Sequence, residues 1–407
     1  MSALACLLQD LGNEVVGSDY PNQYFTDQIL EERKIKIYNF NEAKFDASYI
    51  YIIGLAFNED NDDVKKIKKN HYKHYYYNDF IGHELDMDII GVSGTHGKTT
   101  TTTFLSQMLN NKVSYIIGDG TGKGIKESNK LVLEACEYKN HFLAYQPEIL
   151  LINNIELDHP DFFKNINEVV LSFQKIVDQS KIAVVNGDDT NIKKLTFNKV
   201  IKVGQDQTND VIFKVIKTNK EGTFINIKEK NKIYAVFIPF FGIHLVYDFV
   251  MAYVACRLLG VNPHIQDLTL PKRRMTEHKY GKTILIDDYG HHPTEIKSLY
   301  NSIKEKYHNY KINVIFQPHT YSRTLTLKKE FKDALSLFDA VYLDKVFPSS
   351  REEESTFKQL KINKIFKKYR SFTPSIIDLI NPNNSEVWVF LGAGTINGYI
   401  KKVIGHK

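Results

Sequence analysis

Apolar residues in this chain gather in runs of strand length, and these runs alternate with longer segments whose apolar positions recur at helical spacing. Such alternation is typical of βαβ units, in which a helix connects two parallel strands. The longest apolar candidates, such as 49–57, fall well short of the roughly 18 residues that a membrane span needs. The pattern therefore predicts an α/β protein with parallel sheets and no membrane insertion.

The runs fall into three blocks, which we expect to be three domains covering residues 1–86, 87–271 and 272–407. The first block opens with MSALACLLQDLG, which is expected to be a helix. Its strands are expected at 14–19, 34–38 and 49–53. We interpret this block as part of a doubly wound sheet.

The second block contains runs expected to be buried strands, at 88–94, 113–117, 131–134, 148–154 and 182–186. Segment 211–239 instead alternates apolar and polar residues around turn signals, which predicts an antiparallel meander flanking the main sheet. The third block has runs at 283–289, 312–317, 340–343 and 387–394 with helical patterns between them, which predicts a second doubly wound sheet.

Composition sharpens this picture. With 407 residues, two or three domains of roughly 150 residues are expected. The formal net charge of +5 is too small and too dispersed for a nucleic-acid groove or a polybasic membrane anchor. Three distant cysteines, Cys6, Cys136 and Cys256, form neither a disulfide framework nor a structural zinc site. No signal peptide is recognised at the start, so we expect a cytoplasmic protein.

Residues 89–99 read IIGVSGTHGKT, an apolar strand followed by a glycine-rich turn and the start of a helix. Glycines let backbone N–H groups converge on phosphate oxygens, Lys98 can reach the β and γ phosphates, and Thr99 can ligate Mg²⁺. The spacing differs from the strict phosphate-loop pattern because Gly91 stands one place too early. We nevertheless predict that the segment binds a nucleotide, through Gly94, Thr95, His96, Gly97, Lys98, Thr99 and Thr100.

Acidic and histidine side chains follow two further buried strands. Glu134 ends the run 131–134 and is the expected Mg²⁺ ligand near a phosphate loop, with Glu137 as the near alternative. Asn154, Asp158 and His159 follow the run 148–154, at the carboxyl end where open α/β sheets place ligands. We favour a metal or substrate contact for His159 over a purely structural role.

The third block places loops directly after two strands, DDYGHHP at 287–293 and QPHTYSR at 317–323. His291 and His292 are adjacent and so point in different directions, which makes a two-histidine metal site from this pair alone improbable. Contact with an anionic substrate is the better interpretation. Arginines are rare beside lysines, so Arg273, Arg274, Arg323 and Arg351 stand out as candidates for bidentate anion clamps.

Together the motifs resemble the ATP-dependent Mur ligases of peptidoglycan synthesis over nearly the whole chain. The resemblance is carried by GTHGKTTT, LEACEY, HFLAYQP, NNIELDHPDFF, NGDD, KRR, DDYGHHPTEI, FQPHTYSRT and LGAGTI, in that order. It implies a central P-loop ATPase domain with a parallel sheet between two Rossmann-like domains. DDYGHHPTEI and FQPHTYSRT narrow the resemblance to the branch of the family that joins L-alanine to UDP-N-acetylmuramate through an acyl phosphate.

The resemblance also implies roles for single residues. Lys98, Glu134 and His159 would be catalytic, with Thr99, Glu134 and His159 holding Mg²⁺. His244, Arg274 and Asp288 would join the phosphate loop in binding ATP. Ser18, Asp19, Tyr289, His291, His292 and Arg323 would bind UDP-N-acetylmuramate or L-alanine. No general base is assigned.

Two departures from the family pattern matter. Leu245 and Asp248 stand where the family carries asparagines for adenine, and leucine cannot hydrogen-bond a base edge. The family also opens with a strand and a glycine-rich loop before the first helix, whereas this chain begins inside that helix. The N-terminal domain is therefore expected to lack its first strand, either because the start was assigned too late or because that part was lost.

Two alternatives stay open. A ligase that recycles whole tripeptides onto UDP-N-acetylmuramate would share these motifs and need a larger acceptor pocket. A degenerate ATP-binding remnant without ligase activity is suggested by the chain start together with Leu245 and Asp248. The sequence leaves the oligomeric state unassigned.

Overall fold

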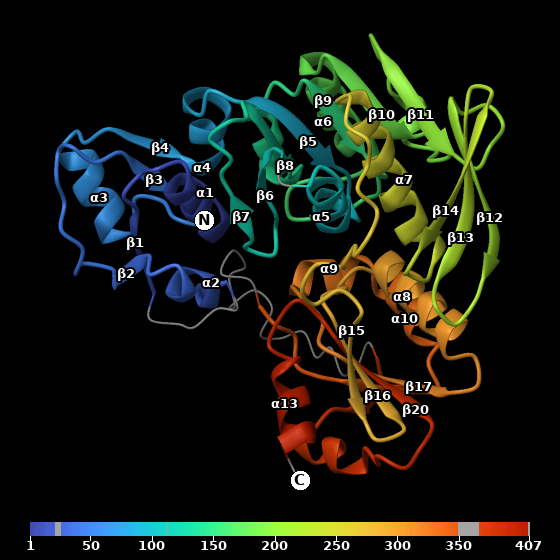
Figure 1. Cartoon of the computed structure of the whole chain (residues 1–407). Coiled ribbons are helices and arrows are strands. Elements are labelled where there is room, and N and C mark those ends of the chain that lie inside the picture. The colour runs from blue at the N-terminus through green and yellow to red at the C-terminus, as the bar shows by residue number, and fades with distance from the viewer. Residues whose placement is uncertain (21–25, 111, 349–365, 406–407) are drawn as a thin grey trace.

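A computed structural model describes residues 1–20, 26–110, 112–348 and 366–405. Its described strands form four sheets in three successive parts of the chain (Figure 1). The N-terminal part contains strands β1–β4 in two separate two-stranded sheets, the central part β5–β14 in one ten-stranded sheet, and the C-terminal part β15–β20 in one six-stranded sheet. The α/β class and the predicted strand runs are confirmed.

The N-terminal part pairs β1 with β2 and β3 with β4, both in parallel. The predicted opening helix is present. The elements are α1 (Ser2–Asp10), β1 (Val16–Asp19), α2 (Asp27–Glu32), β2 (Lys36–Asn39), β3 (Tyr51–Ile53), α3 (Asp62–Lys69), β4 (His74–Tyr76), α4 (Tyr77–Asp79) and the π-helix η1 (Phe80–Glu84).

Helix α1 joins the N-terminal part to the central part because its two sides enter different cores. Cys6 packs with Leu30 and Ile35 in a small cluster of the N-terminal part. Leu4 and Leu7 instead belong to the core on one face of the central sheet. The first helix is therefore anchored to the central sheet as well as to its own neighbours.

The central sheet has the strand order β14-β13-β12-β11-β10-β9-β5-β8-β6-β7. Its strands run parallel from β12 to β6, whereas β13, β14 and β7 are antiparallel to their neighbours, so the predicted meander is confirmed. The strands are β5 (Asp88–Ser93), β6 (Ser114–Ile116), β7 (Gly122–Lys123), β8 (Lys130–Glu134), β9 (Ile149–Ile152), β10 (Ile182–Asn186), β11 (Val200–Gly204), β12 (Val211–Thr218), β13 (Thr223–Glu229) and β14 (Lys232–Ile238).

Helices cover both faces of this sheet, which explains why its parallel strands are continuously apolar. Residues of α5 and α7 share one core with alternate residues of β5, β8 and β9, and residues of α6 and α1 share the other core with the remaining ones. The helical segments are α5 (Lys98–Met108), α6 (Ile166–Gln179) and α7 (Ile243–Leu258), with 3-10 helices η2 (Tyr138–Ala144) and η3 (Ile192–Lys194).

The C-terminal sheet has the order β15-β16-β20-β17-β18-β19, with only β15 antiparallel to its neighbour, and apolar clusters lie on both of its faces. Its elements are β15 (Thr276–Tyr280), β16 (Thr283–Asp288), α8 (Pro293–Lys306), β17 (Lys311–Phe316), α9 (Tyr321–Thr326), α10 (Lys328–Leu335), β18 (Ala340–Leu343), β19 (Arg370–Ser371), the 3-10 helix η4 (Pro374–Leu379), β20 (Glu386–Leu391) and α13 (Gly398–Gly405).

The register of three central strands positions the site. Strand β5 lies between β8 and β9, and all three run parallel. Val92 pairs with Glu134, and Ser93 pairs with Ile152, so the carboxyl ends of the three strands lie side by side. The loops that follow them must therefore meet at one edge of the sheet.

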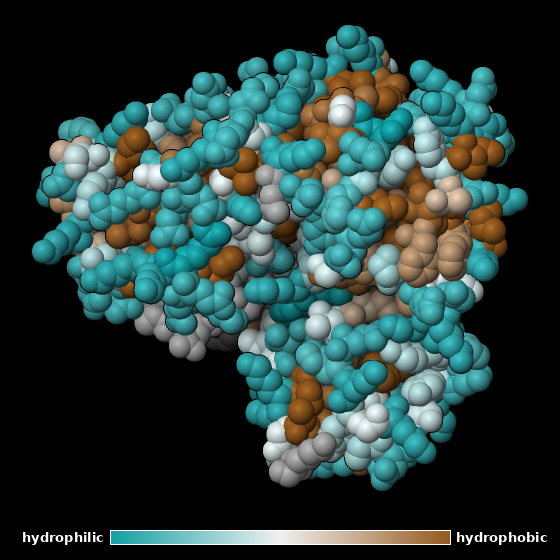
Figure 2. All heavy atoms as spheres, in the orientation of Figure 1, coloured by the Kyte–Doolittle hydropathy of each residue, from teal (hydrophilic) through white to brown (hydrophobic). Residues whose placement is uncertain are grey.

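The surface in view is mainly polar (Figure 2). Figure 2 shows one face on which hydrophilic residues predominate and hydrophobic residues form separate small areas. Among the helices of the described residues, none has the length and apolar character that crossing a membrane would need.

We predict that Gly122→Ala destabilises the protein by about 1–3 kcal/mol, the usual cost of overpacking. A Cβ at Gly122 would overlap the backbone carbonyl of Ala3, so α1 could not keep its place against β7. Urea unfolding of both chains measures the difference. Gly398→Ala is the matched control, because a Cβ there meets no atom within 4 Å. Equal stability of Gly122→Ala and the control would contradict the packing of α1 described above.

Candidate active site

The loop between β5 and α5 has glycines where side chains would collide with neighbouring atoms. Gly97, at the N-terminus of α5, has φ of 79°, and a Cβ there would overlap the Asp248 carboxylate. Gly94 has φ of 133°, and a Cβ there would lie 3.1 Å from the backbone nitrogens of Asn153 and Asn154. Only glycine suits both positions. The loop therefore keeps the tight turn that is typical of phosphate-binding loops at the start of a helix.

Lys98 extends back over this loop rather than into solvent. Its Nζ donates to the carbonyl oxygens of Gly94 and Thr95 and lies 3.0 Å from Glu137 Oε2. Burial lowers the pKa of the Lys98 ammonium, but the neighbouring acidic groups, above all Glu137, together raise it. The lysine is thus a fixed, permanently charged group at the phosphate loop.

Glu134 ends β8 next to the same loop. Its carboxylate accepts hydrogen bonds from the Gly118 backbone N–H and the Thr99 side chain, and burial raises its pKa. A hydroxyl and a carboxylate side by side form a donor set that suits Mg²⁺, which binds through one or two protein oxygens plus phosphate and water. Thr99 and Glu134 therefore fit the ion that the sequence predicts.

His159 fits Mg²⁺ less well than these two residues. It follows β9 with φ of 53°, and its Nε2 lies 4.0 Å from Glu137 Oε1. Burial lowers the pKa of its imidazole, so the ring is neutral near pH 7. An imidazole nitrogen is a poorer Mg²⁺ ligand than an oxygen. The structure brings His159 to the Lys98–Glu137 pair, where its ring packs on Tyr138 with centroids 4.5 Å apart.

The loop after β9 also contacts the C-terminal part, through an ion pair between Asp158 and Arg323. Arg323 donates from Nε to Asp158 Oδ1 at 2.8 Å and from Nη2 to Asp158 Oδ2 at 3.2 Å, and both side chains are buried. Burial would raise the pKa of the Asp158 carboxyl, but Arg323 holds it well below its usual range. The carboxylate that Arg323 clamps is therefore one of the protein's own, from a loop of the central part.

The carboxyl end of β16 carries a further buried acidic residue, Asp288. Asp288 accepts from the Met275 and Gly290 backbone N–H groups at 2.8 and 2.7 Å, and burial raises its pKa to about 6. Arg274 donates to Glu295 Oε1 at 3.2 Å. Arg273 instead donates to Asp287 and to backbone carbonyls, which makes it a structural residue of the C-terminal part.

His291 and His292 do point in different directions, as expected from their adjacency. The His291 ring lies near Tyr289 and His319, with centroids 5.5 Å apart in each case, and burial with Arg323 lowers its pKa to about 3. His292 begins α8, where its Nδ1 accepts from the Thr294 backbone N–H, and burial lowers its pKa to about 4. Both rings are neutral at pH 7.

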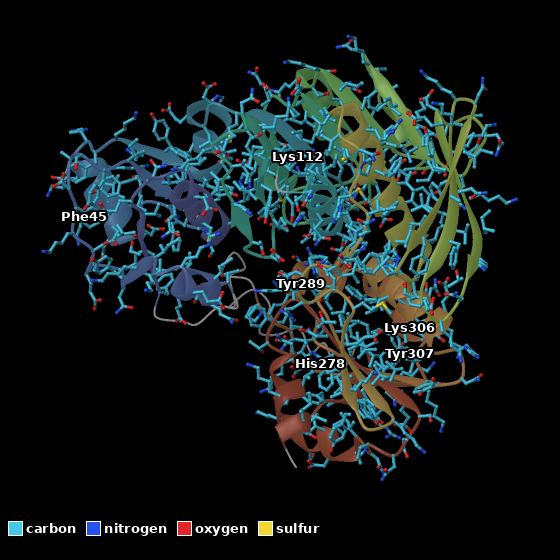
Figure 3. The ribbon with its side chains drawn as sticks, viewed as in Figure 1. Phe45, Lys112, His278, Tyr289, Lys306 and Tyr307 are labelled. Carbon is cyan, nitrogen blue, oxygen red and sulfur yellow. The ribbon has the colours of Figure 1, made fainter. Side chains whose placement is uncertain are left out.

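Tyr289 stands between the arginines of the preceding segment. Its ring lies 5.2 Å from the Arg273 guanidinium and 5.6 Å from that of Arg274. Figure 3 shows Tyr289 where the C-terminal part meets the central part. Lys306 and Tyr307, labelled in the same view, both donate to Glu277. The aromatic ring therefore helps hold Arg274 at the junction.

A groove of about 430 Å³ lies at this junction, with Phe241, Leu245, Leu270, Arg274 and Lys306 among its lining residues. Leu245 contributes an apolar wall. The second departure, Asp248, is buried under the phosphate loop and accepts from Asn153 Nδ2 at 3.2 Å.

His244 lies at the start of α7. Burial and Arg274 lower its pKa to about 4, and its Nδ1 has no hydrogen-bond partner among the described residues. Ser18 and Asp19 belong to β1 in the N-terminal part, and neither is among the residues that contact Lys98 within the described chain. The predicted site residues that the structure brings together around the phosphate loop therefore come from the second and third blocks.

Three acidic residues that were not predicted as site residues contact predicted ones. Glu137, named only as an alternative, is the partner of Lys98. Glu156 lies 3.4 Å from His96 Nε2, and Glu295 accepts from the backbone N–H groups of His291 and His292. The sequence does contain a signal for Glu295, since a glutamate three residues after a helix cap is typical of a capping box. Arg351 lies outside the described residues.

The fold and the loop between β5 and α5 are typical of one class of protein, the nucleotide-binding α/β enzymes, and here the C-terminal part packs over that loop. Sequence comparison agrees. Residues 1–87 match the Mur ligase family, catalytic domain; residues 92–256 match the Mur ligase middle domain; and residues 273–385 match the Mur ligase, glutamate ligase domain. The chain belongs to the Mur ligase family, whose members are ATP-dependent carboxylate-amine ligases.

Individual relatives support the same placement. The chain is 35% identical over 416 residues to the UDP-N-acetylmuramate--L-alanine ligase of Lactococcus lactis subsp. lactis (strain IL1403), covering 98% of this chain and 93% of the relative. The fold is similar to the crystal structure of UDP-N-acetylmuramate-alanine ligase from Thermotoga maritima, with a TM-score of 0.79, 22% identity and coverage of 100% and 96%. A murein peptide ligase from Psychrobacter arcticus 273-4 gives a TM-score of 0.69 at 19% identity, with coverage of 100% and 96%.

We predict that Asp248→Asn makes the protein more stable at alkaline pH. Burial raises the pKa of Asp248 to about 8, so between about pH 4 and pH 8 the folded state keeps a proton that the unfolded state has lost. Stability therefore falls as pH rises through this window, by up to about 1.4 kcal/mol per pH unit. The asparagine variant lacks this loss.

Thermal unfolding at pH 5 and pH 8 measures the effect. The gain from Asp248→Asn should be larger at pH 8 than at pH 5. Asp60→Asn, at an exposed position, is the matched control and should show no such trend. A gain that stays constant between the two pH values would show that Asp248 does not hold its proton.

Proposed function

We propose that the chain joins L-alanine to the carboxylate of UDP-N-acetylmuramate with consumption of ATP, in peptidoglycan precursor synthesis. The observation that carries this proposal is the meeting of Lys98, Glu134 and the loop after β9 at one sheet edge, directly beneath Arg274 and Arg323 of the C-terminal part. Similarity to the named alanine ligases supports the choice of substrates.

ATP would lie with its phosphates on the loop from Gly94 to Thr100, including Thr95, His96, Gly97, Lys98 and Thr99. Arg274 and Asp288 would contact the nucleotide from the C-terminal part, and His244 would contact it from α7. The groove beside Arg274 has the apolar walls that suit a nucleoside base. Leu245 would pack against that base without hydrogen-bonding to it, so recognition of adenine would depend on backbone groups and shape.

Mg²⁺ would be held by Thr99 and Glu134, with His159 nearby. When bound, the ion offsets the charge that develops on the transferred phosphoryl group. The protein's own contribution is Lys98, whose fixed ammonium supplies the same compensation without needing to move. Glu137 and the carbonyl oxygens of Gly94 and Thr95 keep that ammonium in position.

The reaction would proceed in two steps. The muramoyl carboxylate attacks the γ-phosphorus of ATP, forming an acyl phosphate and releasing ADP. The amine of L-alanine then attacks the acyl carbon, and phosphate leaves as the amide forms and the amine loses a proton. Tyr289, His291, His292 and Arg323 would position the acceptor side, and Ser18 with Asp19 would contact the uridine diphosphate.

Arg323 would act mainly by positioning. Its Nε and Nη2 groups are used by Asp158, so only Nη1, near His319, faces elsewhere. The ion pair keeps the C-terminal part over the phosphate loop, which excludes water from a reactive acyl phosphate.

We also propose domain limits of 1–86, 87–271 and 272–407 and a cytoplasmic location.

A coupled phosphate-release assay with UDP-N-acetylmuramate and L-Ala, L-Ser, Gly or a tripeptide tests the function. We predict the highest kcat/KM with L-alanine. Preference for the tripeptide would instead identify a recycling ligase, and no turnover with any acceptor would contradict the ligase proposal.

We predict that Lys98→Ala lowers kcat by on the order of 10²–10³ or more, since the charge that compensates phosphoryl transfer is lost. Because this variant leaves Glu137 buried without its partner, the pair Lys98→Ala/Glu137→Gln should recover thermal stability but not activity. Turnover above about a tenth of the wild-type rate in the folded double variant would exclude Lys98 from the chemistry.

A further inference from the structure

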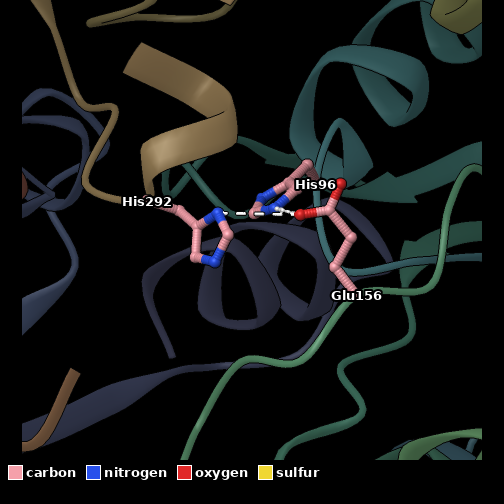
Figure 4. A group of neighbouring side chains, drawn as sticks. All are labelled: His96, Glu156 and His292. Carbon is pink, nitrogen blue, oxygen red and sulfur yellow. Dashed lines mark ion pairs between the residues drawn. The ribbon is translucent and has the colours of Figure 1, made fainter. Parts of the chain in front are cut away.

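A second cluster of ligand atoms lies beside the phosphate loop, apart from the Thr99–Glu134 pair. It consists of His96 from the loop after β5, Glu156 from the loop after β9, and His292 at the start of α8 (Figure 4). One atom from each residue lies within 4.8 Å of the other two, and among the described residues this is the only group of three or more His, Cys, Asp or Glu side chains that comes so close. We propose that these three residues bind a divalent transition metal of the Zn²⁺ type.

The distances already approach those of a tetrahedral site. Zinc–nitrogen and zinc–oxygen bonds of about 2.0–2.1 Å place neighbouring ligand atoms about 3.3–3.4 Å apart. His96 Nε2 lies 3.4 Å from Glu156 Oε2, and His292 Nδ1 lies 3.8 Å from the same oxygen. The two rings have centroids 4.4 Å apart. The third pair of atoms, one nitrogen from each ring, lies within 4.8 Å and has to come closer when a metal binds.

One histidine has unused bonding capacity that the site would satisfy. His96 Nε2 is buried and has no hydrogen-bond partner within the described chain. A buried ring nitrogen without a partner is costly, and metal coordination is one way to satisfy it. At His292, coordination through Nδ1 displaces only the long 3.3 Å contact with the Thr294 backbone N–H.

The backbone around the ligands is held in place, as a metal site needs. His96 donates its backbone N–H to Asn154 Oδ1, and its carbonyl accepts from Asn154 Nδ2. Glu156 Oε2 accepts from Thr294 Oγ1 at 2.7 Å, which orients the carboxylate toward α8. The Glu156 side chain is 36% exposed, which leaves a path from solvent.

The donor set selects the kind of metal. Two imidazole nitrogens and one carboxylate suit Zn²⁺ and its neighbours in the first transition row, whereas Mg²⁺ prefers oxygens and keeps its water. With three protein ligands the fourth position stays open to water or an anion. Since two ligands come from the central part and one from the C-terminal part, a bound ion would tie the phosphate loop to α8.

The test uses the full chain without a histidine tag, freed of metal by a chelator and kept free of nucleotide. Titration with Co²⁺ should show one equivalent bound with the strong visible absorption of four- or five-coordinate cobalt, displaced by Zn²⁺. His96→Gln, Glu156→Gln and His292→Asn should each weaken binding ten-fold or more. Asparagine at 292 can still accept from the Thr294 backbone N–H, so α8 keeps its cap.

His264→Gln is the matched control, because this histidine is not part of the cluster, and it should bind like the wild type. Saturating Zn²⁺ should also raise the melting temperature of wild type and control but not of the three variants. Unchanged binding in all three folded variants, absence of binding in the wild type, or sulfur-to-cobalt absorption from a cysteine site would each overturn the proposal. Should one variant not fold, the other two still decide.

Discussion

The parallel pairing of β5 with β8 on one side and β9 on the other is the constraint from which the site follows. Because the three strands end at the same edge, the phosphate loop, Glu134 and the loop containing Asp158 and His159 must converge there. Helices cover both faces of the sheet, so these side chains cannot turn away from one another into solvent on either face. Charges gathered in so little space then have to compensate one another.

That compensation explains the acidic residues around the loop. Lys98 needs Glu137, Arg323 needs Asp158, and Arg274 needs Glu295, since an unpaired buried charge is far more costly than a paired one. The Lys98–Glu137 and Arg323–Asp158 pairs differ in which parts of the chain they hold together. The Lys98 pair is internal to the central part, whereas the Asp158–Arg323 pair connects two sheets. Pairing of buried charges therefore both fixes Lys98 at the phosphate loop and holds the C-terminal part over that loop.

The phosphate loop is thus in contact with two distinct sets of side chains. On one side stand the hydroxyl and carboxylate of Thr99 and Glu134, which suit a hard ion beside phosphates. On the other stand two imidazoles and the Glu156 carboxylate, which suit a softer one. His96, in the loop, and Thr99, in the first turn of α5, face these different environments, and the backbone turns sharply between Gly94 and Gly97.

The sequence by itself determined the class of fold, the three blocks of strands, the phosphate loop and the family, because these depend on local periodicity and short motifs. It also identified Glu134, His159 and Arg323 as residues at strand ends or in the loops that follow. Only the tertiary structure decided the partners. Arg323 meets Asp158, 165 positions away, and Asp248 lies under the loop, away from the groove. Such pairings depend on how sheets dock through buried, non-local contacts, and no local pattern encodes those distances.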